Sequence, residues 1–538
     1  MRMISSFENR LFHRIKKLSS LILGALVSAT CLIPPRFAHP RANDNARNAE
    51  FPYKTYSETE VAAALQRPLT LEDCIGIALR KSIPLRIAQG DLERAEAARA
   101  GSYGAFLPVF SLDASRDNSL SEDAKGFDLN EDEVTDSLGG LIPSRFANQA
   151  SIAGKIQLYT LTGASLQLTK DFFHDVNMPL SKRSGTPDAL TSKIDNASYA
   201  VRLSQPLLRG AGPTVARGSV ISTGYDRQMQ EWSLLDDKLQ TVFTIKRVYY
   251  DALSKRELLK VNEAAVRSDS ALVKASQALI LAKLASRRDV LSAEIRLADD
   301  LAALIKAQND YQRALDALKD IMGLPIGMLI NVDETGLSFV LVTLDEPALI
   351  RRAVEGNPAL QSLAVAIKRG RLQRSLAKNA LLPQLNLEAS YSSNLGKDLV
   401  LNQNSSKKGG WQAAVSLSYA FLNRDAAADA EIAEIAVRQQ EDRLLDQQRQ
   451  IVVSIREIVR SVYTSAEEIK AIEQGIKAAE EKLDFANTMF NLGRASNFDV
   501  TESQEFLLKA KTQYLRKLVD YHTQLALLES LTGQPITP

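Results

Sequence analysis

One stretch of eleven residues decides the fold. It runs from Trp411 to Phe421 and reads WQAAVSLSYAF. Its odd-numbered positions are apolar or aromatic, whereas its even-numbered positions are small or polar. Alternate residues of a β-strand point to opposite faces, so this strand has one apolar face with aromatic ends and one polar face. About ten residues with aromatic ends are typical of a strand that crosses a membrane within a β-barrel.

Three other segments alternate in the same way and predict further strands. They are residues 110–115, 199–204 and 385–392. An additional pair, 156–158 and 166–168, flanks Thr162-Gly163 and forms either a hairpin on the loop side or an extension of the barrel strands. The aromatic residues that we expect to face the membrane are Trp411, Tyr419, Phe421, Tyr391 and Tyr199.

The same alternation would also fit an ordinary soluble β-sandwich. Four strands without a second sheet cannot form a closed core, and exposed strand edges need a partner. Closure by several identical chains meets both needs. The alternation does not specify how many chains take part.

The predicted strands belong to two copies of one unit. Leu107-Pro108 and Leu382-Pro383 each precede an alternating segment and lie 275 residues apart. Asp289-Val290 and Asp499-Val500 lie 210 residues apart, as do the later glycines Gly323 and Gly533. The first copy therefore carries about 65 extra residues, which we place between 118 and 197.

Each copy also contains a very long helical pattern, at residues 213–284 and 425–492. Charged residues along both patterns exclude a membrane span and favour a coiled coil. The shorter helices are expected to lie end to end beside the long ones: 69–103 with 289–322, and 346–380 with 499–531. About 70 helical residues extend on the order of 100 Å.

The N-terminus has the features of an export signal. Basic residues precede an uncharged, mostly apolar run from Leu18 to Pro35, and small residues follow near Ala42. We expect a signal peptide at 1–42 and an N-terminal extension at 43–68. A membrane anchor is the alternative, and Cys31 raises the question of lipidation, although Ser28 to Thr30 fit a lipoprotein cleavage box poorly.

Composition and motifs argue against several classes of function. The formal net charge of +2 gives no general reason to expect nucleic acid as a partner. Two cysteines and four histidines do not form a disulfide framework or a metal cluster, and no phosphate-binding glycine loop is present. We expect no enzymatic activity, no cofactor and no bound metal, and we expect His522 to be a packing or surface residue.

Several motifs resemble those of the outer-membrane efflux protein family, the TolC-like channels. Leu69 to Asp73 resembles the start of the family's domain, and both Leu-Pro pairs resemble its helix-to-strand junctions. Ser204 to Gly210 is similar to the strand end that leads into its long helix, and Asn491 to Val500 is similar to its helix-turn-helix tip. The resemblance covers about residues 69–535.

The resemblance implies a mainly α fold with a β-barrel portion. Three protomers would each give four strands to a 12-stranded transmembrane barrel, and their antiparallel coiled-coil helices would form a periplasmic α-barrel. The implied domains are two repeats, 69–330 and 346–538, joined by a linker at 331–345. The implied location is the outer membrane of a Gram-negative-type bacterium, with the helices in the periplasm and the barrel in contact with lipid.

The function that the resemblance implies is passive exit. An inner-membrane transporter and a periplasmic adaptor protein would be the partners of the homotrimer. Drugs, metals, small toxic molecules and secreted proteins all remain open as substrates. The alternative is a periplasmic coiled-coil adaptor or structural protein without a pore, which would lack the strand at 411–421.

The resemblance also identifies gate candidates. Asp499 and Glu502 match the family's constricting acidic residues, and Asp289 matches the corresponding position of the first tip. Three-fold symmetry would turn each carboxylate into a ring that favours cations and raises the pKa of its own members. Asp499 also follows Ser496 as a helix-capping acid would, and the two roles are compatible.

Two departures from the family concern charge. Arg287 and Arg288 make the first tip basic, and Lys283 stands where the family often has glycine. These cations could hold a closed state through ion pairs or bind an acidic adaptor, although only a network would act as a lock. An acidic segment at 122–136 is interpreted as a solvated external loop, or alternatively as a collector of cations at the pore mouth.

Overall fold

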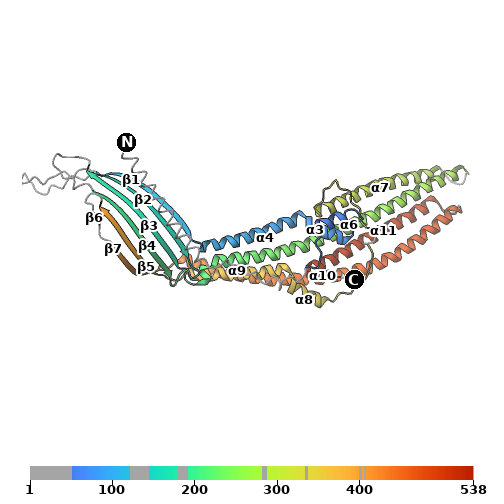
Figure 1. Cartoon of the computed structure of the whole chain (residues 1–538). Coiled ribbons are helices and arrows are strands. Elements are labelled where there is room, and N and C mark those ends of the chain that lie inside the picture. The colour runs from blue at the N-terminus through green and yellow to red at the C-terminus, as the bar shows by residue number, and fades with distance from the viewer. Residues whose placement is uncertain are drawn as a thin grey trace, which may run out of the picture. The chain divides into compact units, whose positions relative to one another are not determined.

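The structure is a computed structural model of the chain, and it describes residues 51–121, 145–179, 192–281, 287–333, 337–398, 403–404, 408–492 and 494–536. The chain divides into two units, residues 1–54 and 55–538, and all of the described helices and strands belong to the second (Figure 1). The expected signal peptide at 1–42, the acidic segment at 122–136 and Lys283 of the first tip lie outside the described residues.

One antiparallel sheet contains every strand of the described residues. Its order is β1-β2-β3-β4-β5, with β7 and the two-residue β6 both pairing with β5. Four strands per chain were expected, and this number was wrong, because the additional pair joins the sheet as β2 and β3. The strands are β1 (Val109–Ser121), β2 (Arg145–Tyr159), β3 (Ser165–Pro179), β4 (Ser192–Pro206), β5 (Gln384–Asp398), β6 (Gln403–Asn404) and β7 (Lys408–Ser418).

The register of the sheet gives it one apolar and one polar face. One row of directly opposed residues crosses all six long strands: Phe110, Ile156, Leu168, Val201, Tyr391 and Trp411. The neighbouring row, on the other face, is Val109, Gln157, Gln167, Arg202, Ser390 and Gln412. A slip of one residue would exchange the faces, so the alternation of the sequence specifies this register.

Two long helices and several shorter ones continue from one end of the sheet (Figure 1). The long ones are α6 (Gly218–Leu281) and α10 (Arg424–Asn491). Nearer the sheet, α4 (Ile83–Ser102) packs on α6, while α9 (Pro358–Ala380) packs on both long helices. Farther away, α7 (Arg287–Ile321) packs on α6, and α11 (Asn497–Thr532) packs on α10 and α6. The end-to-end arrangement expected for the short helices is therefore present.

The first short helix is broken, which the sequence pattern did not predict. A single helix at 69–103 was expected, but Ser82 is non-helical and separates α3 (Leu71–Lys81) from α4. Pro84 lies in the first turn of α4, where its missing N–H costs no hydrogen bond. The same break separates α8 (Glu346–Gly356) from α9 at Asn357, with Pro358 beginning α9.

The remaining short elements are α2 (Glu58–Ala64), α5 (Pro213–Ala216) and the single turn η2 (Tyr103–Phe106). None of the described helices combines the length and apolarity that crossing a membrane requires.

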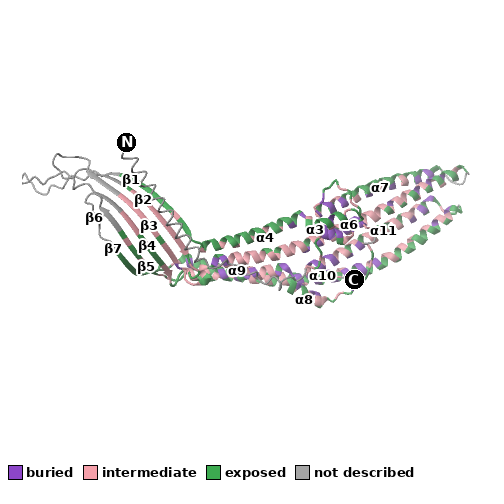
Figure 2. Ribbon diagram, viewed as in Figure 1, coloured by how far each residue is buried: buried purple, intermediate pink, exposed green. Residues whose placement is uncertain are grey.

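The hydrophobic core lies among the helices. Figure 2 shows the buried residues gathered there, whereas the strand residues whose burial is described are intermediate or exposed. Ile455, Val462 and Ile469 of α10 recur every seven residues and are buried against Leu518 and Leu528 of α11. Such spacing is typical of coiled-coil packing and explains why helices of this length are stable.

The seam between α6 and α7 is partly polar. Asn262, Asp269 and Ser276 of α6 are buried at seven-residue spacing. The facing helix buries Ala293, Asp300, Ala307 and Ala314 at the same spacing. Polar residues at core positions of a coiled coil reduce stability and specify register.

Asp269 is the least satisfied member of this seam. Its nearest cation is Arg296, whose Nε lies 3.9 Å from Asp269 Oδ2 and 3.5 Å from Asp300 Oδ1. Neither carboxylate oxygen of Asp269 has a hydrogen-bond partner among the described residues. Burial, reinforced by the adjacent Asp300 and only partly opposed by Arg296, raises the pKa of Asp269 to about 7.

Two matched glycines provide a first test of the fold. Gly323 and Gly533 end α7 and α11 with φ of 66° and 70°. An added Cβ would lie 2.3 Å from the Lys81 carbonyl oxygen at Gly323, but no closer than 4.0 Å to any neighbour at Gly533. We expect Gly533→Ala to lower the free energy of unfolding by about 1 kcal/mol, the cost of a left-handed alanine. Gly323→Ala should cost distinctly more, because the backbone near Lys81 must also move. Thermal denaturation of both variants measures the difference, and equal losses would contradict the contact.

The buried carboxylate predicts a pH dependence of stability. Because the pKa of Asp269 is higher in the folded chain than in the unfolded chain, the folded state binds the additional proton between about pH 4 and 7. The stability of the folded state should therefore fall as the pH rises through this window. Asp269→Asn should remove that part of the fall, so the variant should melt at a higher temperature than the wild type at pH 8 and at a similar temperature near pH 4.

Glu505→Gln is the control, since Glu505 faces the same Arg296 at 3.9 Å but is 68% exposed. It should leave the pH dependence in place. A lower melting temperature for Asp269→Asn at pH 8 would mean that attraction to Arg296 outweighs the cost of burial.

Candidate functional site

The candidate site is the end of the helices farthest from the sheet (Figure 1). Here α6 approaches α7, and α10 turns into α11. The second turn is closed by the backbone N–H groups of Arg494 and Ala495, which both donate to the Met489 carbonyl oxygen, at 2.8 and 3.2 Å. Leu272, Ala293, Phe490 and Val500 form a small buried cluster that joins the two hairpins.

Asp499 is a helix-capping residue at this turn. Its Oδ2 accepts hydrogen bonds from the backbone N–H and the hydroxyl of Ser496, both at 2.8 Å. The Asp499 N–H donates in return to Ser496 Oγ at 3.4 Å, which completes a capping box. These hydrogen bonds from Ser496 hold the pKa of the exposed Asp499 carboxyl below its usual range. The side chain is therefore already charged and ordered within one chain.

Glu502 lies one turn farther along α11 and connects it to α10. Its Oε2 lies 2.8 Å from Lys482 Nζ, and both side chains are about half exposed. The same ammonium lies 4.2 Å from the centroid of the Phe506 ring, within the range of a cation–π interaction. Within a single chain, the charge of Glu502 is thus directed at Lys482.

Asp289 is connected to the start of α11 through a residue that the sequence analysis did not select. Asn497, 5% exposed, donates from Nδ2 to the Asp289 carbonyl oxygen at 2.9 Å and to Ser276 Oγ at 2.7 Å. It therefore joins α11 to both α6 and α7. The only sequence signal was its position directly after the capping Ser496, where an asparagine is normally explained by the cap itself.

Arg287 and Arg288 begin α7 and are exposed. Positive charge at a helix N-terminus opposes the helix dipole, so neither arginine serves the stability of α7. No ion pair joins either of them to an acid among the residues that the structure describes. A lock between these arginines and the acidic rings of neighbouring chains stays a prediction.

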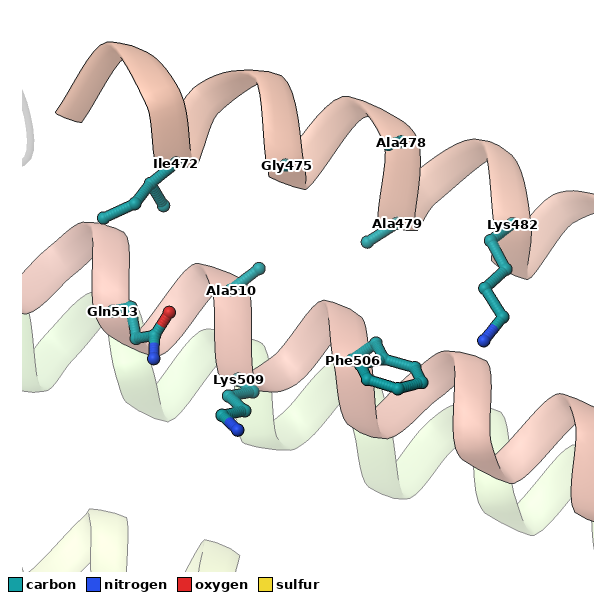
Figure 3. Close-up of a pocket in the computed structure, with 9 residues that line it drawn as sticks. All are labelled: Ile472, Gly475, Ala478, Ala479, Lys482, Phe506, Lys509, Ala510 and Gln513. Carbon is teal, nitrogen blue, oxygen red and sulfur yellow. The ribbon is translucent and has the colours of Figure 1, made fainter. Parts of the chain in front are cut away.

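A shallow groove of about 590 Å³ lies beside this tip, between α10 and α11 (Figure 3). Small residues, Gly475, Ala478, Ala479 and Ala510, line it, and they leave room between the two helices. Phe506, Lys482 and Lys509 also line the groove and make part of its rim basic. The groove therefore combines an apolar floor with positive charge.

The described residues contain no arrangement of three acidic, histidine or cysteine side chains that could hold a metal ion. His522, which we expected to be a packing or surface residue, stacks on the Tyr250 ring with centroids 4.4 Å apart. One of its ring nitrogens lies 3.0 Å from the Ser338 carbonyl oxygen. Burial lowers the pKa of His522, which favours the neutral ring in this packed position.

The five aromatic residues expected at the membrane are all exposed. Tyr391 lies directly opposite Trp411, and Tyr199 lies on the same face of the sheet. Tyr419 and Phe421 follow β7 and contact each other edge to face, with centroids 5.4 Å apart. The sheet thus presents an aromatic, apolar surface with no covering element among the described helices.

Comparison with known proteins finds similarity to one family. Residues 349–534 match the family described as outer membrane efflux protein. Among curated proteins, the chain is 22% identical over 297 residues to outer membrane protein TolC of Vibrio cholerae serotype O1, a match that covers 54% of this chain and 67% of that protein.

Solved outer-membrane channels share the fold. The Campylobacter jejuni CmeC channel superposes with a TM-score of 0.61 at 14% identity, over 86% of this chain and 85% of CmeC. VceC of Vibrio cholerae superposes with a TM-score of 0.60 at 15% identity, over 87% and 97% of the two chains. The open state of Neisseria gonorrhoeae MtrE superposes with a TM-score of 0.59 at 14% identity, over 87% of this chain and 89% of MtrE.

The outer membrane is the location that the matched family and these proteins have in common. In sequence over residues 349–534, and in fold over most of the chain, this protein is similar to the outer membrane efflux proteins, the family whose motifs its sequence resembles.

Proposed function

We propose that the chain is one protomer of a homotrimeric exit channel in the outer membrane of a Gram-negative-type bacterium. The sheet forms part of a transmembrane β-barrel, and the helices form a periplasmic α-barrel that continues the same duct. The channel transports small molecules or proteins passively. An inner-membrane transporter and a periplasmic adaptor protein supply the energy and the coupling of a tripartite efflux or type I secretion system.

The observation that carries this proposal is the two-faced sheet joined to the long helices. A row of apolar side chains from Phe110 to Trp411 crosses six strands on one face, and the neighbouring row on the other face is polar in every strand except β1, which contributes Val109. An apolar face suits lipid, and a polar face suits a water-filled lumen. Tyr199, Tyr391 and Trp411 then lie on the lipid side, with Tyr419 and Phe421 near the interface.

A periplasmic adaptor without a pore is the alternative, and the same observation disfavours it. Such a protein has no use for an apolar face that exposes Trp411, Val415 and Leu417 at 81, 66 and 68%. Exposed apolar surface of this extent indicates contact with lipid or with another protein.

The tip is proposed as the gate. In a trimer, Asp289, Asp499 and Glu502 form acidic rings that favour cations, and the exposed Arg287 and Arg288 are available to acids of a neighbouring chain or of an adaptor. The low pKa of Asp499 keeps its ring charged at neutral pH. The groove between α10 and α11 is the proposed contact for an adaptor helix, because its small residues admit a helix and its lysines attract acidic side chains.

Single-channel conductance of the purified protein in a planar bilayer, with cross-linking to count chains, tests the proposal. We expect small, cation-selective current steps from a trimer. A protein that stays soluble without detergent and does not conduct would exclude the channel and favour the adaptor.

The gate residues have a separate test. Glu502→Gln should weaken cation selectivity, because it removes one ring of charge and leaves Lys482 without its 2.8 Å partner. Asp499→Asn should weaken selectivity and also loosen the turn. Glu468→Gln is the matched control, since it breaks a 2.6 Å pair with Lys517 elsewhere on the same two helices. Reversal potentials measured in a salt gradient report the change, and selectivity that Glu502→Gln and Glu468→Gln alter equally would remove Glu502 from the gate.

A further inference from the structure

The hairpin formed by β2 and β3 spans the full height of the sheet. Its strands are fifteen residues long, as are β4 and β5. Its turn lies at the helical end, where the Gly212 N–H donates to the Thr162 carbonyl oxygen at 3.3 Å. The approach is so close that a Cβ on Gly163 would lie 2.7 Å from the Gly210 carbonyl oxygen. The hairpin is therefore anchored beside the strand-to-helix junction rather than in an external loop.

The hairpin also has the same two faces as the rest of the sheet. Ile156 and Leu168 lie in the apolar row that ends at Trp411. On the polar face, Lys155 Nζ lies 3.1 Å from Asp113 Oδ2 of β1, and Ser198 of β4 donates to Asp171 at 3.1 Å. A hairpin surrounded by water would have no reason to keep one face apolar. The β2–β3 hairpin therefore has the features of two further strands in the wall of the barrel.

The two outer strands of the described sheet, β1 and β7, each pair on one side only. Apolar side chains are exposed along both. At the helical end, Phe421 and Leu422 after β7 are 87 and 85% exposed, while Val109 and Phe110 of β1 are 57 and 48% exposed. Unpaired edges with exposed apolar ends are surfaces for strand addition.

The sequence itself specifies how these edges fit each other. Val201-Arg202-Leu203-Ser204 at the end of β4 resembles Val415-Ser416-Leu417-Ser418 at the end of β7, 214 residues later. The Leu-Pro pairs before β1 and β5 lie 275 residues apart. Since β4 pairs with β5, the corresponding partner of β7 is β1 of another copy.

The correspondence can be checked by applying the register of β4 with β5 to β7 and β1 of the next chain. Ser204 lies opposite Glu388, so Ser418 should lie opposite Asp113 of the next chain. The same register then places Ala114, Leu112 and Phe110 opposite Leu417, Tyr419 and Phe421. Every apolar residue in this set meets an apolar one, and the polar faces also coincide, although a shift of one residue would have reversed them.

We propose that β1 of each chain pairs with β7 of the next in this register, and that six long strands from each of three chains close a barrel of 18 strands. The inference rests on the trimeric channel of the proposed function and adds the partner surface and the width of the exit. Because barrel diameter grows roughly in proportion to strand number, the exit is about 1.5 times as wide as a 12-strand barrel would allow. Its polar lining suits hydrated cargo that is too wide for a 12-strand barrel.

Disulfide trapping tests the register. Ser115 and Ser416 face the polar side and should lie opposite each other across the interface, so Ser115→Cys with Ser416→Cys should link chains on oxidation. The control pairs Ser115→Cys with Gln412→Cys, which has the same face but lies four residues away, about 13 Å along the strand. The native Cys74 does not interfere, because it is fully buried and burial raises the pKa of its thiol.

Covalent trimers from the first pair, and few from the control, are the expected result on a non-reducing gel. A conducting trimer that does not cross-link at the first pair, or that cross-links equally in the control, would overturn this interface and leave the channel intact. A protein that remains monomeric and does not conduct would overturn both the interface and the channel.

Pore width gives an independent measurement. The largest polyethylene glycol that enters the pore and lowers its conductance measures the exit diameter. Deleting residues 145–179 should let β1 pair directly with β4, as β5 pairs with β7, and should narrow the exit by about one third. An unchanged diameter in a conducting deletion variant would exclude the hairpin from the wall. If the deletion does not fold, the cysteine pairs still decide.

Discussion

The constraint on which the structure depends is that each backbone N–H and C=O group of the sheet needs a hydrogen-bond partner. A strand in lipid has no water to bond, so a membrane sheet must close on itself. In the described sheet, the inner strands have hydrogen-bonded neighbours on both sides. The outer strands β1 and β7 each have one unpaired edge. In the proposed channel, closure therefore needs other chains, and the helices take their arrangement from the ring that the strands form.

The helices obey a different constraint. The helices of 64 and 68 residues gain most of their stability from packing against neighbouring helices rather than from intrinsic helix propensity. On α10 the seam is aliphatic, with Ile455, Val462 and Ile469 at seven-residue spacing. The corresponding seam of α6 includes the buried carboxylate Asp269 in place of an aliphatic side chain. The buried carboxylate makes the α6–α7 seam less stable than the aliphatic seam of α10, a difference that suits the gate proposed for this end of the helices.

Much of this fold follows from the sequence, because the two-residue period of the strands and the helical period of the long segments are easily told apart. The alternation from Trp411 to Phe421 specified one strand and its two faces, and the long uninterrupted patterns specified α6 and α10. The breaks at Ser82 and Asn357 were missed because local periodicity continues through them. The status of the hairpin stayed open because alternation reveals faces but not neighbours. The pairing of Ile156 with Phe110 and of Leu168 with Val201 places the hairpin in the sheet, between β1 and β4.

The site was less predictable, since its key contacts join distant parts of the chain. Asp499 could be identified from Ser496 three residues earlier. The contacts of Asn497 with Ser276 and Asp289 join residues more than 200 positions apart, and no local pattern encodes them. The pairing of β4 with β5 has the same long range, between residues 180 to 204 positions apart. Loops of this length close slowly. During synthesis, β1 to β4 are therefore complete long before β5 exists, and their apolar face must be shielded in transit. The wall of the proposed channel therefore depends on one of the longest-range pairings in the chain, and its apolar face stays incomplete until β5 has been synthesised.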